Sequence, residues 1–437
     1  MTRGLMKTAS SIAVAAAAGL FATSAMAADL GGNCCADLEE RVAELEATTA
    51  RKGNRKVSLT VYGRITTGIL WHDSDEEDAY RSEKLTVRQN NASPTVFGFR
   101  GEAQIRPELT AGYWMEIWVQ EDTGTSSKDG AFTIRQNNVY LDSQQLGRLT
   151  LGQASQTTDG LFEINLANVI RTPGSGNEEI GNFLGAAFNT TFADVFDGGR
   201  AQGIYYRTPT LAGFVLGAGY SHGTEKAGEV DTSETWDVAL KYAGEFNGVR
   251  IAAGIGYRET VDDDMLARTP IDDQTWLGSA SIMHMPTGLF LSGGYADTDS
   301  EYEERQRRGY WLMAGIEKNW FGYGNTTIFG EYGAVDFDHE VAGATPTTVG
   351  PWTVGWTADP TADRLDGHFW GLGLVQTIDS AATDLYINFR RYELDSTTTG
   401  YDYLAVCGFF CLQPDTQDVK AGSRDATVIQ GGMRIQF

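Results

Sequence analysis

The stretch Val428–Phe437, VIQGGMRIQF, alternates between apolar or small residues and polar ones. One face carries Ile429, Gly431, Met433, Ile435 and Phe437; the other carries Gln430, Gly432, Arg434 and Gln436. A period of two predicts a β-strand, and two unlike faces predict two unlike surroundings. The chain is therefore expected to end on a strand with one apolar face and one wet face.

The first 27 residues have the pattern of a secretory signal. Arg3 and Lys7 precede an apolar run from about Ile12 to Phe21, and Ala25-Met26-Ala27 supplies small residues for cleavage. The run is too short for a membrane span, which needs about 20 apolar residues. We expect residues 1–27 to be removed, so that Ala28 becomes the first residue of the exported protein.

The rest of the sequence contains no window that resembles a transmembrane helix. The exported chain is therefore either soluble or a β-barrel that crosses a membrane. The full sequence contains 52 glycines and 11% aromatic residues. The formal net charge of −24 argues against binding to nucleic acid or to anionic lipid.

Residues 28–55 are predicted to hold a short helix. Cys35, Leu38, Val42, Leu45 and Thr49 recur at steps of three and four, which is the seam of a coiled coil. Two heptads are marginal alone in water, so this coiled coil would need partner chains. The alternative is a single amphipathic helix on the protein surface.

After this segment the hydrophobic period changes to two, and about sixteen predicted strands follow. They are residues 57–71, 96–105, 109–120, 133–142, 147–153, 203–209, 213–221, 235–246, 249–259, 274–284, 289–297, 309–318, 326–337, 367–379, 383–394 and 426–437. Many have the length with which a tilted strand crosses a bilayer.

The connections between these strands alternate between short and long. Short ones such as RPE at 106–108 and FNG at 246–248 separate long ones such as 73–93 and 395–425. Transmembrane barrels have this asymmetry, with short periplasmic turns and long outer loops. We predict that residues 56–437 form an all-β membrane domain, a sixteen-stranded antiparallel transmembrane β-barrel whose last strand pairs with its first, preceded by the periplasmic helical stem.

The sequence Cys34–Gly63, CCADLEERVAELEATTARKGNRKVSLTVYG, resembles the N-terminus of alphaproteobacterial general porins of the rhizobial type. The resemblance implies a homotrimeric, water-filled pore in the outer membrane, with the loop at about 155–201 folded inward. It also implies that Phe437 is a signal for the barrel-assembly machinery. Some porins that this chain resembles begin Ala-Asp and are joined to peptidoglycan through the terminal amine, which Ala28-Asp29 matches.

The four cysteines fall into two pairs. In an exported protein disulfides are the default expectation, and we predict a Cys407–Cys411 bridge within one loop. Adjacent cysteines rarely pair with each other, so Cys34 and Cys35 are expected to bridge between subunits or to stay reduced.

Arginines on four strands are predicted to point into the barrel. By alternation Arg64, Arg100, Arg390 and Arg434 face inward, and their strands are consecutive around a closed barrel. They would form one basic wall of a pore constriction. The alternative is that they only solvate the wall and pair with Glu102 and Glu116.

The longest loop, about 155–201, is acidic. Its carboxylates are Asp159, Glu163, Glu178, Glu179, Asp194 and Asp197, against Arg171 and Arg200. Folded inward, this loop would set carboxylates opposite the arginine wall and create a transverse field across a narrow aqueous gap. Ions and small hydrophilic solutes would then diffuse passively through the channel.

Two other classes of function were weighed. A barrel enzyme would need a nucleophile with an adjacent histidine, and the five scattered histidines offer no such pair. A tether that joins the envelope layers through the N-terminal helix is the remaining alternative. The sequence predicts no enzyme activity, no cofactor and no metal site.

Overall fold

The computed structural model describes residues 57–74, 85–90, 92–120, 131–171, 173–174, 192, 196–222, 233–262, 271–300, 305–338, 345–349, 352–357, 364–401 and 416–437. The predicted signal and helical stem, residues 1–55, lie outside this part of the chain, and so does the Cys407–Cys411 pair. No helix among the described residues is long and apolar enough to cross a membrane.

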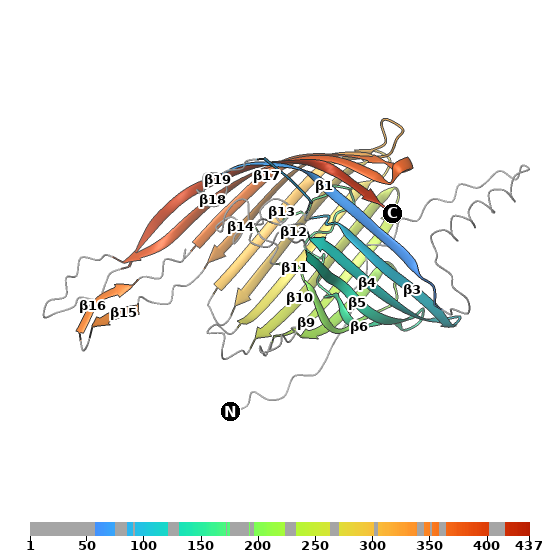
Figure 1. Cartoon of the computed structure of the whole chain (residues 1–437), viewed down its shortest axis with the longest axis horizontal. Helices are drawn as coiled ribbons and strands as arrows, with labels where there is room; N and C mark the ends of the chain where they lie inside the picture. Colours follow the sequence, from blue (N-terminus) through green and yellow to red (C-terminus); the bar gives the residue numbers. More distant parts are fainter. Residues whose placement is uncertain are drawn as a thin grey trace, which may run out of the picture.

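The chain folds into one closed antiparallel sheet (Figure 1). Its strands are β1 (Thr60–Ser74), β2 (Leu85–Arg88), β3 (Val96–Arg106), β4 (Leu109–Gln120), β5 (Ala131–Ser143), β6 (Gly147–Ser155), β7 (Arg200–Arg207), β8 (Phe214–His222), β9 (Glu234–Phe246), β10 (Val249–Asp262), β11 (Ile271–His284), β12 (Leu289–Ser300), β13 (Arg305–Lys318), β14 (Thr326–Asp338), β17 (Arg364–Ile378), β18 (Thr383–Tyr401) and β19 (Thr416–Gln436). Because β2 and β3 both pair with β1, they share one position, and the barrel has sixteen strands. The predicted sixteen-stranded barrel is confirmed.

The barrel closes where β1 pairs with β19, in a register from Arg64 opposite Gln436 to Ser74 opposite Ala426. Phe437 extends this seam, because its N–H donates to the carbonyl of Gly63 at 3.0 Å and its carbonyl accepts from the N–H of Gly63 at 2.9 Å. Closure gives the first and last strands of the barrel a hydrogen-bonded neighbour on both sides, so the sheet has no edge where it begins and ends.

The predicted alternation of faces appears in β1. Val61, Ile65 and Ile69 are about half exposed, whereas Thr66 and Leu70 on the opposite face are fully buried. The exposed apolar residues form the outer surface of the barrel, and the buried ones face its interior. The inner face is therefore covered by other parts of the chain over much of its area.

Aromatic rings mark two levels on the outer face. Trp236, Tyr257 and Trp276 pack in a row across β9–β11, with ring centroids 5.1 and 4.8 Å apart. Toward the other end of these strands, Phe214 packs against Tyr242 at 4.7 Å. An apolar band between two aromatic girdles is the pattern of a barrel in a bilayer.

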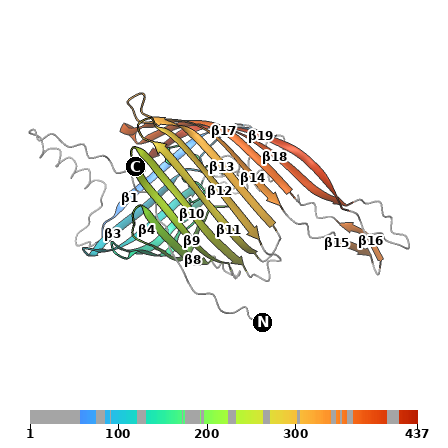
Figure 2. The same cartoon turned by 180° about the vertical axis from the view of Figure 1, so that it is seen from behind.

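One end of the barrel carries only tight connections, and we call it the short-turn end. The turn between β9 and β10 is Asn247-Gly248, both with positive φ (50° and 76°), which matches the twist of a two-residue hairpin. The connection between β17 and β18 includes the 3-10 turn η1 (Asp379–Ala381). The strand ends that the longer connections join lie at the opposite end of the barrel, which we call the long-loop end; Figure 2 shows β8–β13 from behind.

Two long connections hold more strand than the sequence pattern predicted. The expected loop at 395–425 is shorter, because Thr397 to Tyr401 pair with Lys420 to Thr416. The connection after β14 contains a separate hairpin of β15 (Thr345–Val349) and β16 (Trp352–Thr357). Main-chain pairing does not need apolar side chains, so alternation could not detect the polar extensions of β18 and β19.

We predict that Gly68→Val destabilises the seam. A Cβ at Gly68 would lie 2.3 Å from the carbonyl oxygen of Gly431 and 2.8 Å from the Cα of Gly432, so β19 would have to shift. Overpacking of this kind costs about 1–3 kcal/mol. The measurement is the temperature at which the folded barrel converts to the unfolded band in gel electrophoresis.

The matched control is Thr67→Val, because Thr67 lies next to Gly68 with its side chain exposed on the outer face. We expect Thr67→Val to convert at the wild-type temperature and Gly68→Val to convert at a lower one. Equal conversion temperatures for the two variants would show that the close approach of β1 to β19 at Gly68 does not contribute to stability.

Candidate functional site

We call the connection between β6 and β7, residues 156–199, the inner segment, and its described residues lie against the inner face of the barrel. It starts at β8 and β9, where Gln156 Nε2 donates to Ser221 Oγ at 3.0 Å and the N–H of Thr158 donates to Asp237 Oδ2 at 2.7 Å. Ser221 and Asp237 are both buried. The described residues of the inner segment then follow the wall from β8 toward β19.

Side-chain hydroxyl groups of β11 hold the middle of the inner segment. The N–H groups of Ile164 and Leu166 donate to Ser279 Oγ and Ser281 Oγ at 2.9 and 3.0 Å. Ser279 in turn donates to the carbonyl of Leu161 at 2.6 Å. A segment outside the strand ladder must satisfy its main-chain groups elsewhere, and these inward serines supply the partners.

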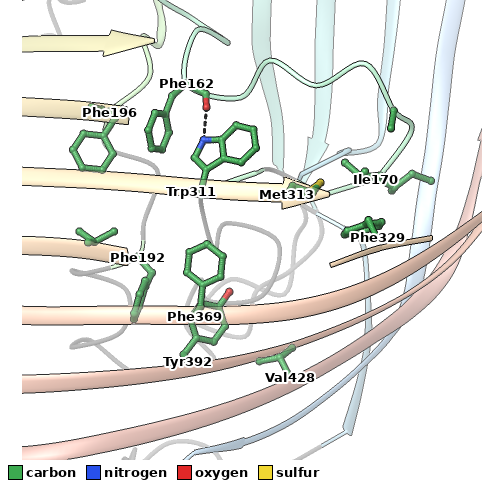
Figure 3. Close-up of a cluster of buried hydrophobic side chains, with 14 of the residues drawn as sticks. Phe162, Ile170, Phe192, Phe196, Trp311, Met313, Phe329, Phe369, Tyr392 and Val428 are labelled. Carbon is green, nitrogen blue, oxygen red and sulfur yellow. Dashed lines mark hydrogen bonds between the residues drawn. The ribbon is translucent and has the colours of Figure 1, made fainter. Parts of the chain in front are cut away.

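Apolar side chains of the inner segment pack against side chains of β13, β17 and β18 on the inner face of the barrel (Figure 3). Phe162 packs edge-on against Trp311 of β13, and the indole N–H of Trp311 donates to the carbonyl of Phe162 at 2.7 Å. Phe192 packs against Phe369 of β17 and Tyr392 of β18. All five side chains are almost fully buried, so water is excluded between this part of the segment and the wall.

Ionic contacts fix the far end of the inner segment. Arg434 of β19 forms a salt bridge with Asp384 of β18 at 2.7 Å, and the same Nη2 donates to Asn168 Oδ1 at 3.2 Å. Its Nη1 donates to Ser93 Oγ at 3.1 Å. Arg434, predicted as part of a basic wall near the periplasmic mouth, thus joins three separate parts of the chain.

Arg390 does not lie on an exposed wall. It is fully buried and binds Glu331 of β14 through two contacts, at 2.9 and 3.1 Å, while Arg171 of the inner segment binds the same carboxylate. The alternation rule placed Arg390 correctly on the inner face but could not show that another segment covers it. Arg390 is therefore linked to the inner segment, because it shares the Glu331 carboxylate with Arg171.

The opposite side of the barrel carries a different set of arginines. Arg64 of β1 lies within electrostatic range of Arg135 of β5, Arg200 of β7 and Arg434. Its Nε donates to the carbonyl of Pro94 at 2.9 Å, and in the described part of the chain no carboxylate forms an ion pair with it. Arg100 of β3 is exposed on the same side.

Arg135 belongs to this group but was not predicted. Its Nε donates to Glu116 of β4 at 2.9 Å, so Glu116 pairs with Arg135 and not with any of the four predicted arginines. A β-bulge explains the omission, because Arg135 and Gln136 together lie opposite Glu116, whereas Ile134 pairs with Ile117. The extra residue reverses the alternation there and aims Arg135 inward.

The predicted acidic residues have different positions. Asp159 lies 3.3 Å from Arg200 in a salt bridge, on the side of the arginine group. Asp197 accepts from the N–H of Phe162 at 2.7 Å and so holds the inner segment together. Glu163 is half-buried. Glu178, Glu179 and Asp194 lie outside the described residues.

We predict that Glu331→Gln loosens the inner segment. The carboxylate of Glu331 binds two buried guanidinium groups, and removal of one member of a buried ion pair costs about 3–5 kcal/mol. The variant should unfold at a lower temperature and be cleaved faster by protease within residues 156–199.

The matched control is Glu245→Gln, because Glu245 forms a half-exposed salt bridge with Arg250 at 3.2 Å. Exposed pairs contribute about 0–1 kcal/mol, so this variant should resemble wild type. Equal protease sensitivity of both variants would contradict an anchoring role for Glu331.

The sequence matches a family model described as Gram-negative porin over residues 13–403. An outer membrane porin protein of Bordetella pertussis is 27% identical over 190 residues, which cover 41% of this chain and 46% of the relative. Outer membrane porin protein 32 of Delftia acidovorans is 26% identical over 192 residues, which cover 43% of this chain and 49% of the relative. This chain thus spans about half the length of the curated relatives that it matches.

Solved structures share the fold. An anion-selective porin from Comamonas acidovorans superposes with a TM-score of 0.55 at 19% identity, covering 87% of this chain and all of the other. The outer membrane protein OmpT of Vibrio cholerae, in a trimer form, has a TM-score of 0.51 at 12% identity, covering 88% of this chain. Since the family model matches most of the sequence, this chain belongs to the Gram-negative porin family and is a protein of the outer membrane.

Proposed function

We propose that this protein forms a water-filled channel through which ions and small hydrophilic solutes diffuse passively. The observation that carries the proposal is the inner segment, whose described residues are fastened to the wall of β8–β19 and narrow the barrel there. A barrel of sixteen strands is wide enough for an aqueous passage, and a folded-in segment reduces it to a sieve.

We further propose that the group of Arg64, Arg100, Arg135 and Arg200 lines this passage and favours anions. Two of the four are paired with carboxylates, Arg135 with Glu116 and Arg200 with Asp159. Arg64 and Arg100 form no ion pair within the described part of the chain, so the group carries net positive charge. Charge at a narrow point sets ion preference, and one protein of similar fold, from Comamonas acidovorans, is an anion-selective porin.

We also propose that the carboxylates of Glu178, Glu179 and Asp194 lie opposite the arginine group, on the other side of the aqueous passage. They belong to the inner segment, but they lie outside the described residues. If they face the arginines, the field across the gap would hold water in an ordered state and would disfavour apolar solutes.

The assembly is also a proposal. We infer a homotrimer of the rhizobial porin type, with residues 28–55 as a periplasmic coiled-coil stem joined to peptidoglycan at Ala28. The resemblance of Cys34–Gly63 supports this inference, and OmpT of Vibrio cholerae, which has a similar fold, has a trimer form. A muropeptide on Ala28, detected by mass spectrometry of digested sacculi, is the test of the link. Free Ala28 amines alone would disprove it.

Phe437 is proposed as the contact for the barrel-assembly machinery. If a protein that lacks Phe437 reached the outer membrane at the wild-type level, that role would be disproved.

We predict that Arg64→Ala lowers the permeability of chloride relative to potassium. Two unit charges about 4 Å apart interact by about 1 kcal/mol in water, which corresponds to roughly a fivefold change in the ratio. The reversal potential of single channels in a potassium chloride gradient is the measurement. The change should shrink as salt rises, since the Debye length falls from about 10 Å at 0.1 M to about 3 Å at 1 M.

Arg64→Lys is the control for that experiment, because it keeps the charge while it removes the planar guanidinium. It should retain the wild-type reversal potential. An Arg64→Ala channel with the wild-type potential at low salt would remove Arg64 from the passage.

We predict that Leu38→Asp combined with Leu45→Asp lowers the temperature at which trimers dissociate, because both positions lie on the seam of the proposed coiled coil. The control is Arg41→Gln combined with Glu44→Gln, outside the seam. If the seam variant dissociates at the same temperature as the control, the stem does not hold the trimer together.

A further inference from the structure

Two tyrosine rings lie flat on the inner face of the barrel, next to the arginine group. The ring of Tyr62 on β1 covers Gly98 of β3, where a Cβ would come within 2.5 Å of the Tyr62 hydroxyl. The ring of Tyr140 on β5 covers Gly112 of β4, where a Cβ would lie 2.2 Å from the ring. The two glycines provide the space in which these rings lie along the wall.

A guanidinium group lies over each ring. The Cζ of Arg100 is 5.3 Å from the centroid of Tyr62, and the Cζ of Arg148 on β6 is 4.1 Å from the centroid of Tyr140. Attraction between a cation and an aromatic face holds each guanidinium in place. Its N–H groups remain available for other partners, because stacking uses the face and not the edge.

The two arginines differ in what their N–H groups bind. Arg148 forms a salt bridge with Asp142. Arg100 is exposed, and no carboxylate of the described chain forms an ion pair with it. Arg100 thus presents an oriented, unpaired fork of donors, which is the geometry that binds a carboxylate through two hydrogen bonds.

Trp114 lies directly beside this fork. It is the cross-strand partner of Arg100 in the pairing of β3 with β4, so the two Cβ atoms are about 4.5–5.5 Å apart. Its side chain is 36% exposed, although Glu116 on the same face is buried. Trp114 alternates with Met115, which is exposed on the outer face, so the indole faces the interior.

Hydrogen bonds hold the indole in position. The indole N–H of Trp114 donates to the Tyr62 hydroxyl, and that hydroxyl donates to Glu116 Oε2 at 2.9 Å. Glu116 is fixed in turn by its salt bridge with Arg135. The large exposed ring is therefore preorganised, and a ligand would lose little binding energy in ordering it.

We propose that Arg100 and Trp114 form a subsite for planar aromatic monocarboxylates, with the carboxylate on the guanidinium of Arg100 and the ring of the solute against Trp114. The inference rests on the proposed channel function and names one solute class that the channel would favour. A saturated ring of similar size could reach Arg100 but would stack less well, because aromatic pairs gain energy beyond the area that they bury.

The nearby charges favour one carboxylate over two. Glu102 lies two residues further along β3, exposed on the same face as Arg100. A second carboxylate on the solute would approach Glu102 and be repelled. Replacement of Glu102 by Gln should therefore strengthen the binding of any carboxylate at Arg100.

The test compares benzoate with cyclohexanecarboxylate, which has the same charge and a similar size but no planar ring. We expect benzoate to halve the chloride current of single channels at a concentration roughly two- to tenfold lower than cyclohexanecarboxylate, the range expected for one aromatic stacking contact. Trp114→Leu should make the two concentrations equal, and Trp114→Phe should keep part of the difference. Arg100→Ala should weaken both blockers, and Glu102→Gln should strengthen both.

Met115→Leu is the control on the same strand, because its side chain lies on the outer face. It should keep the wild-type chloride current and the preference for benzoate. Each variant is first shown to run as a folded barrel, and Trp114→Phe serves as the informative variant if Trp114→Leu does not fold. Equal blocking by the two acids in wild type, or a difference that persists without an aromatic ring at residue 114, would overturn the subsite.

Calorimetric titration of the purified barrel with benzoate separates this inference from the proposed function. If the protein conducts chloride but binds both acids equally, the channel function is supported and the Arg100–Trp114 subsite is disproved. If the protein binds benzoate preferentially but conducts no ions, the subsite is supported and the channel function is disproved.

Discussion

Main-chain hydrogen bonding between the first and last strands determines the rest of this structure. The pairing of β1 with β19 leaves no strand edge and makes the barrel a closed wall around an interior. Its circumference is then fixed by the sixteen strands and cannot contract when side chains change. An interior of this width must be filled by water or by another part of the chain.

The inner segment fills part of the interior, and the chemistry of the wall decides where it lies. Its main-chain groups need partners, and Asp237, Ser279 and Ser281 supply them on one side of the barrel. Phe162 and Trp311 exclude water there, and Glu331 forms ion pairs with the buried guanidinium groups of Arg171 and Arg390. The side of β1–β7 instead carries the half-buried Arg64 and Arg135 and the exposed Arg100 and Arg200. The asymmetry of the passage is therefore a consequence of where the segment can satisfy its backbone.

Much of the fold could be predicted from the sequence, because the period of two is a direct property of strand geometry. The alternation in β1 and the short turns, such as Asn247-Gly248, specify the strands and their connections. The site was harder to predict. Alternation assigns a residue to a face, but it does not show that Arg390 is covered by another segment, and a bulge reverses it at Arg135. The role of Glu331 depends on contacts across 160 residues of sequence, for which a local pattern has no signal.

The central claim is that the described residues of the inner segment cover the wall of β8–β19, whereas the arginines of β1–β7 face the aqueous passage. The most direct measurement is the reaction of engineered cysteines with a small anionic thiol reagent, in a chain whose Cys34, Cys35, Cys407 and Cys411 are replaced by serine. Arg64→Cys places a thiol on the open wall. Ser281→Cys places a thiol of nearly the native size beneath Leu166, where the native side chain is 1% exposed. The account predicts rapid labelling and an altered current for Arg64→Cys and no labelling of folded Ser281→Cys. Equally rapid labelling of both would contradict it.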